Sequence, residues 1–167
     1  GAAGAAGAAD DEIAGVNVNL ADGSGDADTL TIAITNADDD TAMTVGEIDS
    51  SDNNVETIAL VLNQGVDIAD ASDIIIEDVE ATAYSSLSVS GAADATFGTG
   101  TAVTLATVNA SEATGDLTFE LGTATTDITT GSGADTIDFN AALTSADTAD
   151  GGDGADTLTA VVGVRKL

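Results

Sequence analysis

A nonapeptide near the end of the chain constrains its fold more than any other feature. Residues 151–159 read GGDGADTLT and match the pattern G-G-x-G-x-D-x-U-x, where U is a large apolar residue, at every specified position. Residues 130–138 read TGSGADTID and match it with one change, because Thr130 stands where the first Gly belongs. Glycine permits a tight turn with positive φ and lets backbone carbonyls approach a cation, and Asp supplies the hard oxygen that Ca²⁺ prefers. The pattern therefore predicts cation-binding turns, each followed by a short strand.

Composition removes most other chemistries. The 167-residue chain contains no His and no Cys, so the usual ligands of zinc, copper, haem and iron–sulfur sites are missing. Nucleophilic triads and histidine acid–base catalysis are missing with them. Glu56, Glu77, Glu80 and Glu120 can be imagined as the acid–base pair of a glycosidase, but glutamate on a strand surface is the ordinary explanation. We expect a protein that is not an enzyme.

The charge of the chain restricts its partners. Thirty Asp and Glu residues stand against Arg165 and Lys166, which gives a net charge of −28. This field repels nucleic acid and anionic membranes, and the chain contains no apolar run long enough to span a bilayer. We therefore expect neither a nucleic-acid partner nor membrane insertion. Self-repulsion also makes divalent cations a predicted condition of folding, with a salt-adapted surface as the compatible alternative.

The first nine residues differ from the rest of the chain. Residues 1–9 are three Gly-Ala-Ala triplets, too few and without the Pro that a collagen helix needs, so we treat them as a low-complexity segment. Residues 10–167 are predicted to form one elongated β-rich domain. The absence of an initiator Met indicates a processed product or a fragment of a larger surface protein.

Apolar alternation predicts an all-β fold. Leu30, Ile32 and Ile34 alternate with polar or small residues, as in a half-buried strand, and the triplet Ile74-Ile75-Ile76 is typical of a strand buried on both faces. The many alternating Thr residues indicate outward strand faces, with O-glycosylation as the alternative. Short strands between turns suit a β-sandwich or a right-handed parallel β-solenoid. The Asp/Gly-rich turns, small side chains and scarce aromatics favour the solenoid, in a β-roll-like form.

The sequence also resembles a known group of proteins. Asn109-Ala110-Ser111, residues 114–119 and the turn at residues 130–137 resemble bacterial S-layer proteins and large surface proteins of the repeats-in-toxin type. Residues 54–58, NVETI, are similar to a strand that recurs in those proteins. The resemblance covers residues 22–160 and concerns the general pattern of residue types, without a unique signature. It implies a secreted, extracellular protein of the cell surface, exported by a type I system, that folds and assembles with Ca²⁺.

The resemblance also assigns calcium-binding roles by position. These fall on three sets of residues: Gly131, Gly133 and Asp135; Gly151, Gly152, Gly154 and Asp156; and Gly23, Gly25 and Asp28, where one residue too many precedes the Asp. In a regular roll of this family, a turn shares its ion with the turn two nonapeptides, about 18 residues, further on. Asp135 and Asp156 are 21 residues apart, so one or two isolated sites are expected instead of a regular stack.

The leading functional prediction is a structural one. We expect a calcium-stabilised module of a bacterial S-layer, sheath or surface filament, which self-assembles into a homo-oligomer or polymer through acidic β-rich subunits. The alternative is an adhesin module of a large protein of the repeats-in-toxin type, which binds glycans, such as a cell-surface polysaccharide, or a host surface. Sugar-binding sites use exposed aromatic rings, but Tyr84, Phe97, Phe119 and Phe139 are few and are expected in the core.

Overall fold

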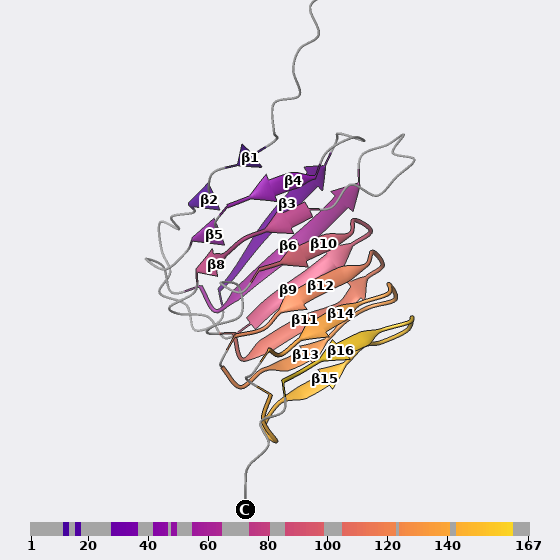
Figure 1. Cartoon of the computed structure of the whole chain (residues 1–167). Helices are drawn as coiled ribbons and strands as arrows, with labels where there is room; N and C mark the ends of the chain where they lie inside the picture. The colour runs from indigo at the N-terminus through magenta and orange to yellow at the C-terminus, as the bar shows by residue number, and fades with distance from the viewer. Residues whose placement is uncertain are drawn as a thin grey trace, which may run out of the picture.

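The computed structural model (Figure 1) describes most of the chain beyond the Gly/Ala segment. The described residues are 12–13, 16–17, 28–36, 42–46, 48–49, 55–64, 74–80, 86–98, 105–122, 124–140 and 143–161. They form sixteen β-strands and no helix. The all-β prediction is confirmed for this part of the chain, and none of the described segments is a helix that could cross a membrane.

The strands form three parallel sheets. The seven-stranded sheet has the order β1 (Glu12–Ile13), β4 (Met43–Val45), β7 (Ile74–Ile76), β10 (Ala95–Phe97), β12 (Leu117–Glu120), β14 (Thr136–Asp138) and β16 (Thr157–Thr159). The six-stranded sheet has the order β3 (Thr29–Asn36), β6 (Thr57–Gln64), β9 (Ser86–Gly91), β11 (Thr107–Ala113), β13 (Asp127–Thr129) and β15 (Thr148–Asp150). The three-stranded sheet contains β2 (Val16–Asn17), β5 (Ile48–Asp49) and β8 (Val79–Glu80).

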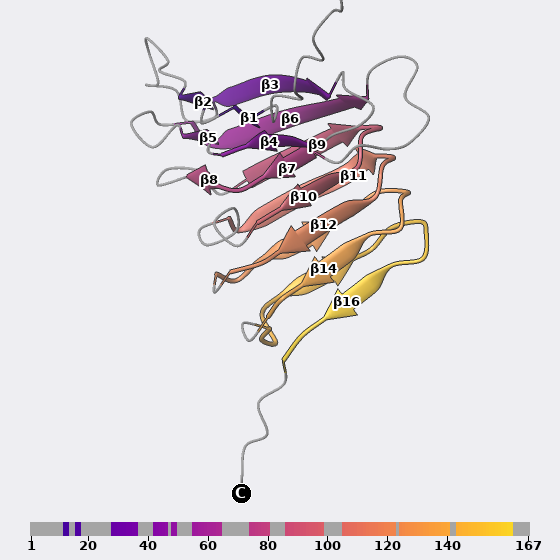
Figure 2. The same cartoon turned by 45° about the horizontal axis from the view of Figure 1, so that its top comes forward.

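The chain visits the sheets in turn, and we call each full passage a coil. Among the described residues, the first three coils contain three strands each and the next three contain two, because the three-stranded sheet ends at β8, and β16 begins a seventh coil. Accordingly, 31 residues separate Val45 from its partner Ile76, but only 18 separate Phe119 from Ile137. Figure 2 shows the coils stacked along one axis. This shortening explains why no fixed repeat length is visible in the sequence.

Every pair of described strands is parallel. The registers run without interruption from β3 through β6 to β9, and the one irregularity lies between Asn109 and Glu112 of β11. A β-sandwich of the kind considered from the sequence is built from antiparallel sheets, so that alternative is wrong. The parallel stacking is compatible with a β-solenoid or β-roll.

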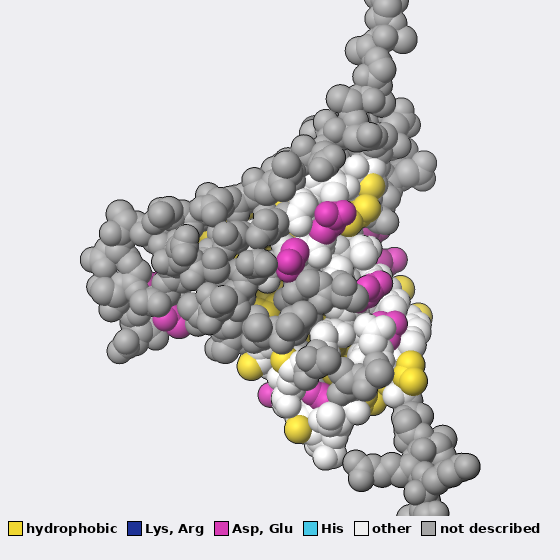
Figure 3. All heavy atoms as spheres, turned by 60° about the vertical axis from the view of Figure 1, so that its left-hand side comes forward, with side chains coloured by type: hydrophobic (Ala, Val, Ile, Leu, Met, Phe, Trp, Pro, Cys, Tyr) yellow, Lys and Arg dark blue, Asp and Glu magenta, His cyan; other side chains and the backbone are white. Residues whose placement is uncertain are grey.

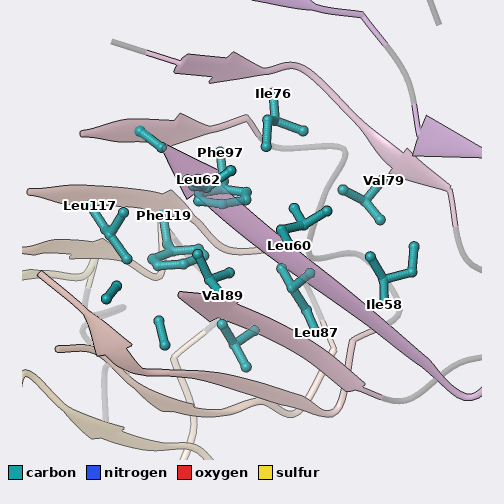
Figure 4. Packing of buried hydrophobic residues seen from close by; sticks show 14 of the residues in the cluster. Ile58, Leu60, Leu62, Ile76, Val79, Leu87, Val89, Phe97, Leu117 and Phe119 are labelled. Carbon is teal, nitrogen blue, oxygen red and sulfur yellow. The ribbon is translucent and has the colours of Figure 1, made fainter. Parts of the chain in front are cut away.

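The core lies between the sheets and is built from columns of apolar side chains. Ile76, Phe97, Phe119 and Ile137 follow one another in register along the seven-stranded sheet, and all are buried. The rings of Phe97 and Phe119 are stacked with centroids 4.5 Å apart (Figure 4). Phe139 is also buried. The prediction that the aromatic residues belong to the core is confirmed for the three phenylalanines, and Tyr84 lies outside the described residues.

Along the strands, residues that face outward alternate with residues that face the core. In β3 the Thr residues are exposed while Ile34 is buried, as predicted from the alternation. Ile75 departs from the prediction, because Ile74 and Ile76 are buried but Ile75 is only half-buried. The pleat turns the middle residue of the triplet away from the core, so β7 is not buried on both faces.

Candidate functional site

The turns that lead from the six-stranded sheet to the seven-stranded sheet lie over one another in four consecutive coils. They comprise residues 91–94, 113–116, 130–135 and 151–156, and form the row of loops at the right-hand edge of Figure 1. The amides of Thr114, Ser132 and Asp153 donate to the carbonyls of Gly91, Ala113 and Gly131 of the preceding coil, at 2.8, 3.1 and 2.9 Å.

The two predicted motif copies are therefore neighbours in this stack. Ile137 pairs with Leu158, so the 21 residues between Asp135 and Asp156 correspond to one coil and do not separate the two turns. The first two turns, GAAD at 91–94 and ATGD at 113–116, were not assigned a cation-binding role from the sequence, because neither contains the full nonapeptide. Their signal is the Asp that directly precedes a strand.

The motif glycines are required by the closeness of the coils. A Cβ atom added to Gly133 would collide with the carbonyl oxygen of Gly115, and one added to Gly154 would collide with that of Gly133. Gly152 and Gly154 also have φ values of 72° and 139°, which residues with a side chain rarely adopt. The glycines thus bring backbone carbonyls of adjacent turns close together, as the cation-binding prediction requires.

The motif aspartates connect one coil to the next. The amide of Leu117 donates to Oδ1 of Asp135 at 2.8 Å, and the amide of Asp135 donates to Oδ1 of Asp156 at 3.0 Å. One position earlier, Asp116 and Asp94 act in the opposite direction along the stack. The amide of Ala134 donates to Asp116, and that of Asp116 donates to Asp94, both at 2.7 Å.

Among these hydrogen-bonded aspartates, Asp135 is the one whose surroundings indicate a ligand. It is 1% exposed, and its Oδ2 atom is buried without a hydrogen-bond partner among the described residues. An ionised carboxylate is costly to bury unless it is paired or coordinates a metal. Pairing with a basic residue of the described part is impossible, because the only basic residues are Arg165 and Lys166. Figure 3 accordingly shows acidic but no basic side chains among the described residues.

The residues around Asp135 fit Ca²⁺ in part. This ion takes 6–8 oxygen ligands from carboxylates, backbone carbonyls and water, and the stacked turns supply the first two kinds. Among the described residues, however, no group of three or more acidic side chains is arranged to hold a metal. A cation at Asp135 would therefore depend largely on backbone carbonyls of the turns at 130–135 and 151–156.

The third predicted set is not part of this stack. Gly23 and Gly25 lie outside the described residues. Asp28 precedes β3, whereas Asp135 and Asp156 precede strands of the seven-stranded sheet. The amide of Asp28 donates to Oε2 of Glu56 at 2.7 Å. The Oδ2 atom of Asp28 is buried without a hydrogen-bond partner among the described residues.

The same type of hydrogen bond, from a backbone amide to a carboxylate, recurs in the turns that lead into strands β13 and β15 of the six-stranded sheet. The amide of Thr126 donates to Oδ1 of Asp147 at 2.9 Å, and Oδ2 of Asp147 accepts from the amide and the hydroxyl of Thr144 at 2.6 and 2.9 Å. The hydrogen bonds from the backbone amides of Thr126 and Thr144 hold the pKa of Asp147 below its ordinary value of 3.8. Asp147 is not part of any motif recognised in the sequence.

Comparisons with known proteins do not assign this chain to a family. No protein-family model matches the chain, and neither a curated protein nor a solved structure matches it.

Proposed function

We propose that this chain is a structural, calcium-stabilised module of a bacterial extracellular assembly, such as an S-layer, sheath or surface filament. The observation that carries the proposal is the buried, unpartnered Oδ2 atom of Asp135 within a stack of Gly/Asp turns. The secreted, cell-surface location rests on the resemblance of the sequence to surface proteins of the repeats-in-toxin type.

In this proposal, Ca²⁺ neutralises carboxylates and orders the turns. Asp135 and Asp156 would supply carboxylate oxygens, and the turns containing Gly131, Gly133 and Gly151 would supply backbone carbonyls. Binding to the folded state alone stabilises that state by mass action. It would also reduce the self-repulsion of a chain with a net charge of −28.

The finer architecture in the proposal is a right-handed parallel β-solenoid. Connections between parallel strands of one sheet are right-handed in about 98% of cases, and every described pair of strands here is parallel. Such a stack has two ends, and an uncovered end can pair with another chain.

Self-assembly is supported by the exposure of the last coil. Ile137 is 3% exposed, but Leu158, its partner in β16, is 57% exposed. Val161 is also exposed, at 65%. β15 and β16 are end strands of their sheets, and all of their residues are exposed. We therefore propose that subunits form a homo-oligomer or polymer and that the exposed apolar side chains of Leu158 and Val161 take part in the contact.

The experiment is a calcium titration followed by circular dichroism and light scattering, with EGTA and magnesium as controls. We expect β-structure and large assemblies to appear together with calcium and to disappear with EGTA. Asp135→Asn should weaken the response, whereas Asp153→Asn, which changes an exposed carboxylate at an unspecified position of the motif, should not. A chain that is fully folded and monomeric in EGTA, and does not respond to calcium, would contradict the proposal.

The adhesin alternative has no comparable support. Phe97, Phe119 and Phe139 are buried, so none of them offers a stacking surface to a sugar. Binding to a polysaccharide panel by the folded monomer would favour that alternative.

A further inference from the structure

The outer face of the six-stranded sheet carries no charge over β3, β6, β9 and residues 107–109 of β11. We call this surface the hydroxyl face; it lies on β3, β6, β9 and β11, which are neighbours in the sheet (Figure 1). Its outward residues are Thr29, Thr31, Ala33, Thr35, Thr57, Ala59, Val61, Asn63, Ser86, Ser88, Ser90, Thr107 and Asn109. All of them are exposed or half-buried.

The neutrality of this face contrasts with the surrounding surface. The outer side of the seven-stranded sheet is flanked by Glu77 and Glu120, both exposed. On the six-stranded sheet itself, the first acid is the exposed Glu112 of β11, which is in register with Ser90 and marks the border of the hydroxyl face. The next acids are the exposed Asp127 and Asp150. In a chain with a net charge of −28, a surface without charge is suited to a neutral partner.

The side chains of the hydroxyl face also form a two-dimensional grid. Thr29, Thr57, Ser86 and Thr107 are in register across the four strands. A second column, two residues further along each strand, contains Thr31, Ala59, Ser88 and Asn109 in the same registers. Adjacent strands are about 4.8 Å apart, and two residues along a strand span about 6.7 Å. The grid therefore places small side chains, most of them polar, at two fixed spacings.

The size and composition of the face argue against a protein or a sugar as its partner and favour ordered water. A rectangle of eight residues by four strands covers at most about 500 Å², below the roughly 800 Å² per partner of a stable protein complex, and Ser is depleted at such interfaces. Sugars are bound by stacking on aromatic rings, and no described aromatic residue is exposed. A periodic array of hydroxyl and methyl groups is instead complementary to a periodic, neutral lattice of water.

We propose that the hydroxyl face binds ice. Threonine and serine hydroxyls would hydrogen-bond ordered water at the two spacings of the grid, which approach the repeats of oxygen atoms on faces of hexagonal ice. The β-branched Thr side chains are stiff at χ1, so their hydroxyls are held in place before binding, and the Ala, Val and Thr methyl groups occupy the spaces between them. This activity is distinct from calcium binding at the turns and requires only that the coils are folded.

The test measures ice binding by the full chain in calcium, after circular dichroism has established that it is folded. Thermal hysteresis and incorporation into a slowly growing ice hemisphere are the two readouts. Ser88→Tyr places a bulky ring at the centre of the face, between Ala59 and Asn109, and Ser88→Lys adds a charge there. Thr118→Tyr is the matched control, because Thr118 is a half-buried outward residue of the seven-stranded sheet.

We expect the unmodified chain and Thr118→Tyr to enter the ice and to show thermal hysteresis, and both Ser88 variants to lose these properties while remaining folded. Exclusion of the folded, unmodified chain from ice would overturn the inference without affecting the calcium proposal. Equal effects of Ser88→Tyr and Thr118→Tyr would also overturn it. Binding to crystalline chitin or cellulose, or dimerisation lost only in the Ser88 variants, would assign the face to a different partner.

Discussion

The backbone amide of Asp135 donates a hydrogen bond of 3.0 Å to the side-chain oxygen Oδ1 of Asp156, one coil further along the stack. The amides of Leu117, Thr126 and Asp28 make the same type of contact with carboxylates of their following coils. In each case the donor lies at or next to the start of a strand. A buried amide without a partner is costly, so carboxylates at these positions extend the hydrogen bonding of the sheets into the turns.

This contact predicts a local effect of Asp156→Ala. The amide of Asp135 would lose its acceptor, and leaving a buried donor unpaired costs about 1–3 kcal/mol. We expect faster hydrogen exchange at the Asp135 amide, measured by NMR in calcium. Asp153→Ala is the control, because Asp153 belongs to the same turn and is exposed. Unchanged protection at Asp135 in the Asp156 variant would contradict the role assigned to this hydrogen bond.

A second prediction concerns the aromatic pair in the core. Phe119 is buried and its ring is stacked on that of Phe97, with 8° between the ring planes. Phe119→Ala should lower the free energy of unfolding by about 3–5 kcal/mol, because it removes apolar contacts and leaves a cavity. Urea unfolding in calcium measures this change.

The control for the aromatic pair is the neighbouring residue in β12. Thr118 is an outward, half-buried residue, and Thr118→Ala should alter stability by no more than about 0.5 kcal/mol. Similar losses in both variants would mean that the column of core residues contributes less than its burial indicates.

Local patterns made much of the fold predictable from the sequence. Alternation of Leu30, Ile32 and Ile34 with polar or small residues predicted β3, and the structure gives a strand there with an exposed Thr face. The glycines of the nonapeptides predicted tight turns, and Gly152 and Gly154 have positive φ values. Both patterns depend on the backbone of a few neighbouring residues, which is why the sequence suffices to recognise them.

Long-range register could not be predicted in the same way. The 31 residues from Val45 to Ile76 and the 21 from Ile137 to Leu158 both represent one coil, because the number of strands per coil changes along the chain. A fixed period was therefore absent from the sequence. The stacking of Asp94 and Asp116 beneath the motif turns, and the ladder at Asp147, depend on this register and became visible only in the structure.

A third prediction tests the packing of the turns. A methyl group on Gly133 would overlap the carbonyl oxygen of Gly115 and would lie 2.9 Å from Cα of Asp116, so the coils would have to move apart. Gly133→Ala should destabilise the fold and reduce calcium affinity, as measured by thermal unfolding and calorimetric titration. Ser132→Ala, at an exposed position of the same turn, should leave both unchanged. Full stability of Gly133→Ala would show that the coils are packed less closely than the contact between Gly133 and Gly115 requires.

A fourth prediction follows from the lowered pKa of Asp147. The hydrogen bonds from the amides of Thr126 and Thr144 favour the ionised carboxylate and hold its pKa below 3.8 in the folded state. The unfolded chain then binds the proton more readily than the folded chain. The stabilisation is consequently complete above the unfolded pKa, about 3.9, and is lost as the pH falls through the lowered folded pKa.

The measurement compares the unmodified chain with Asp147→Ala over a range of pH in calcium. We expect Asp147→Ala to be less stable by a constant amount from neutral pH down to about pH 4, because Asp147 is half-exposed and ionised throughout. Below that range the difference should shrink, since protonation removes the charge from the unmodified chain. Ser145→Ala, at an exposed position of the same turn, should show no difference at any pH. A difference between the chain and Asp147→Ala that grows as the pH falls would have the opposite sign and would contradict the stabilising role of the ionised carboxylate.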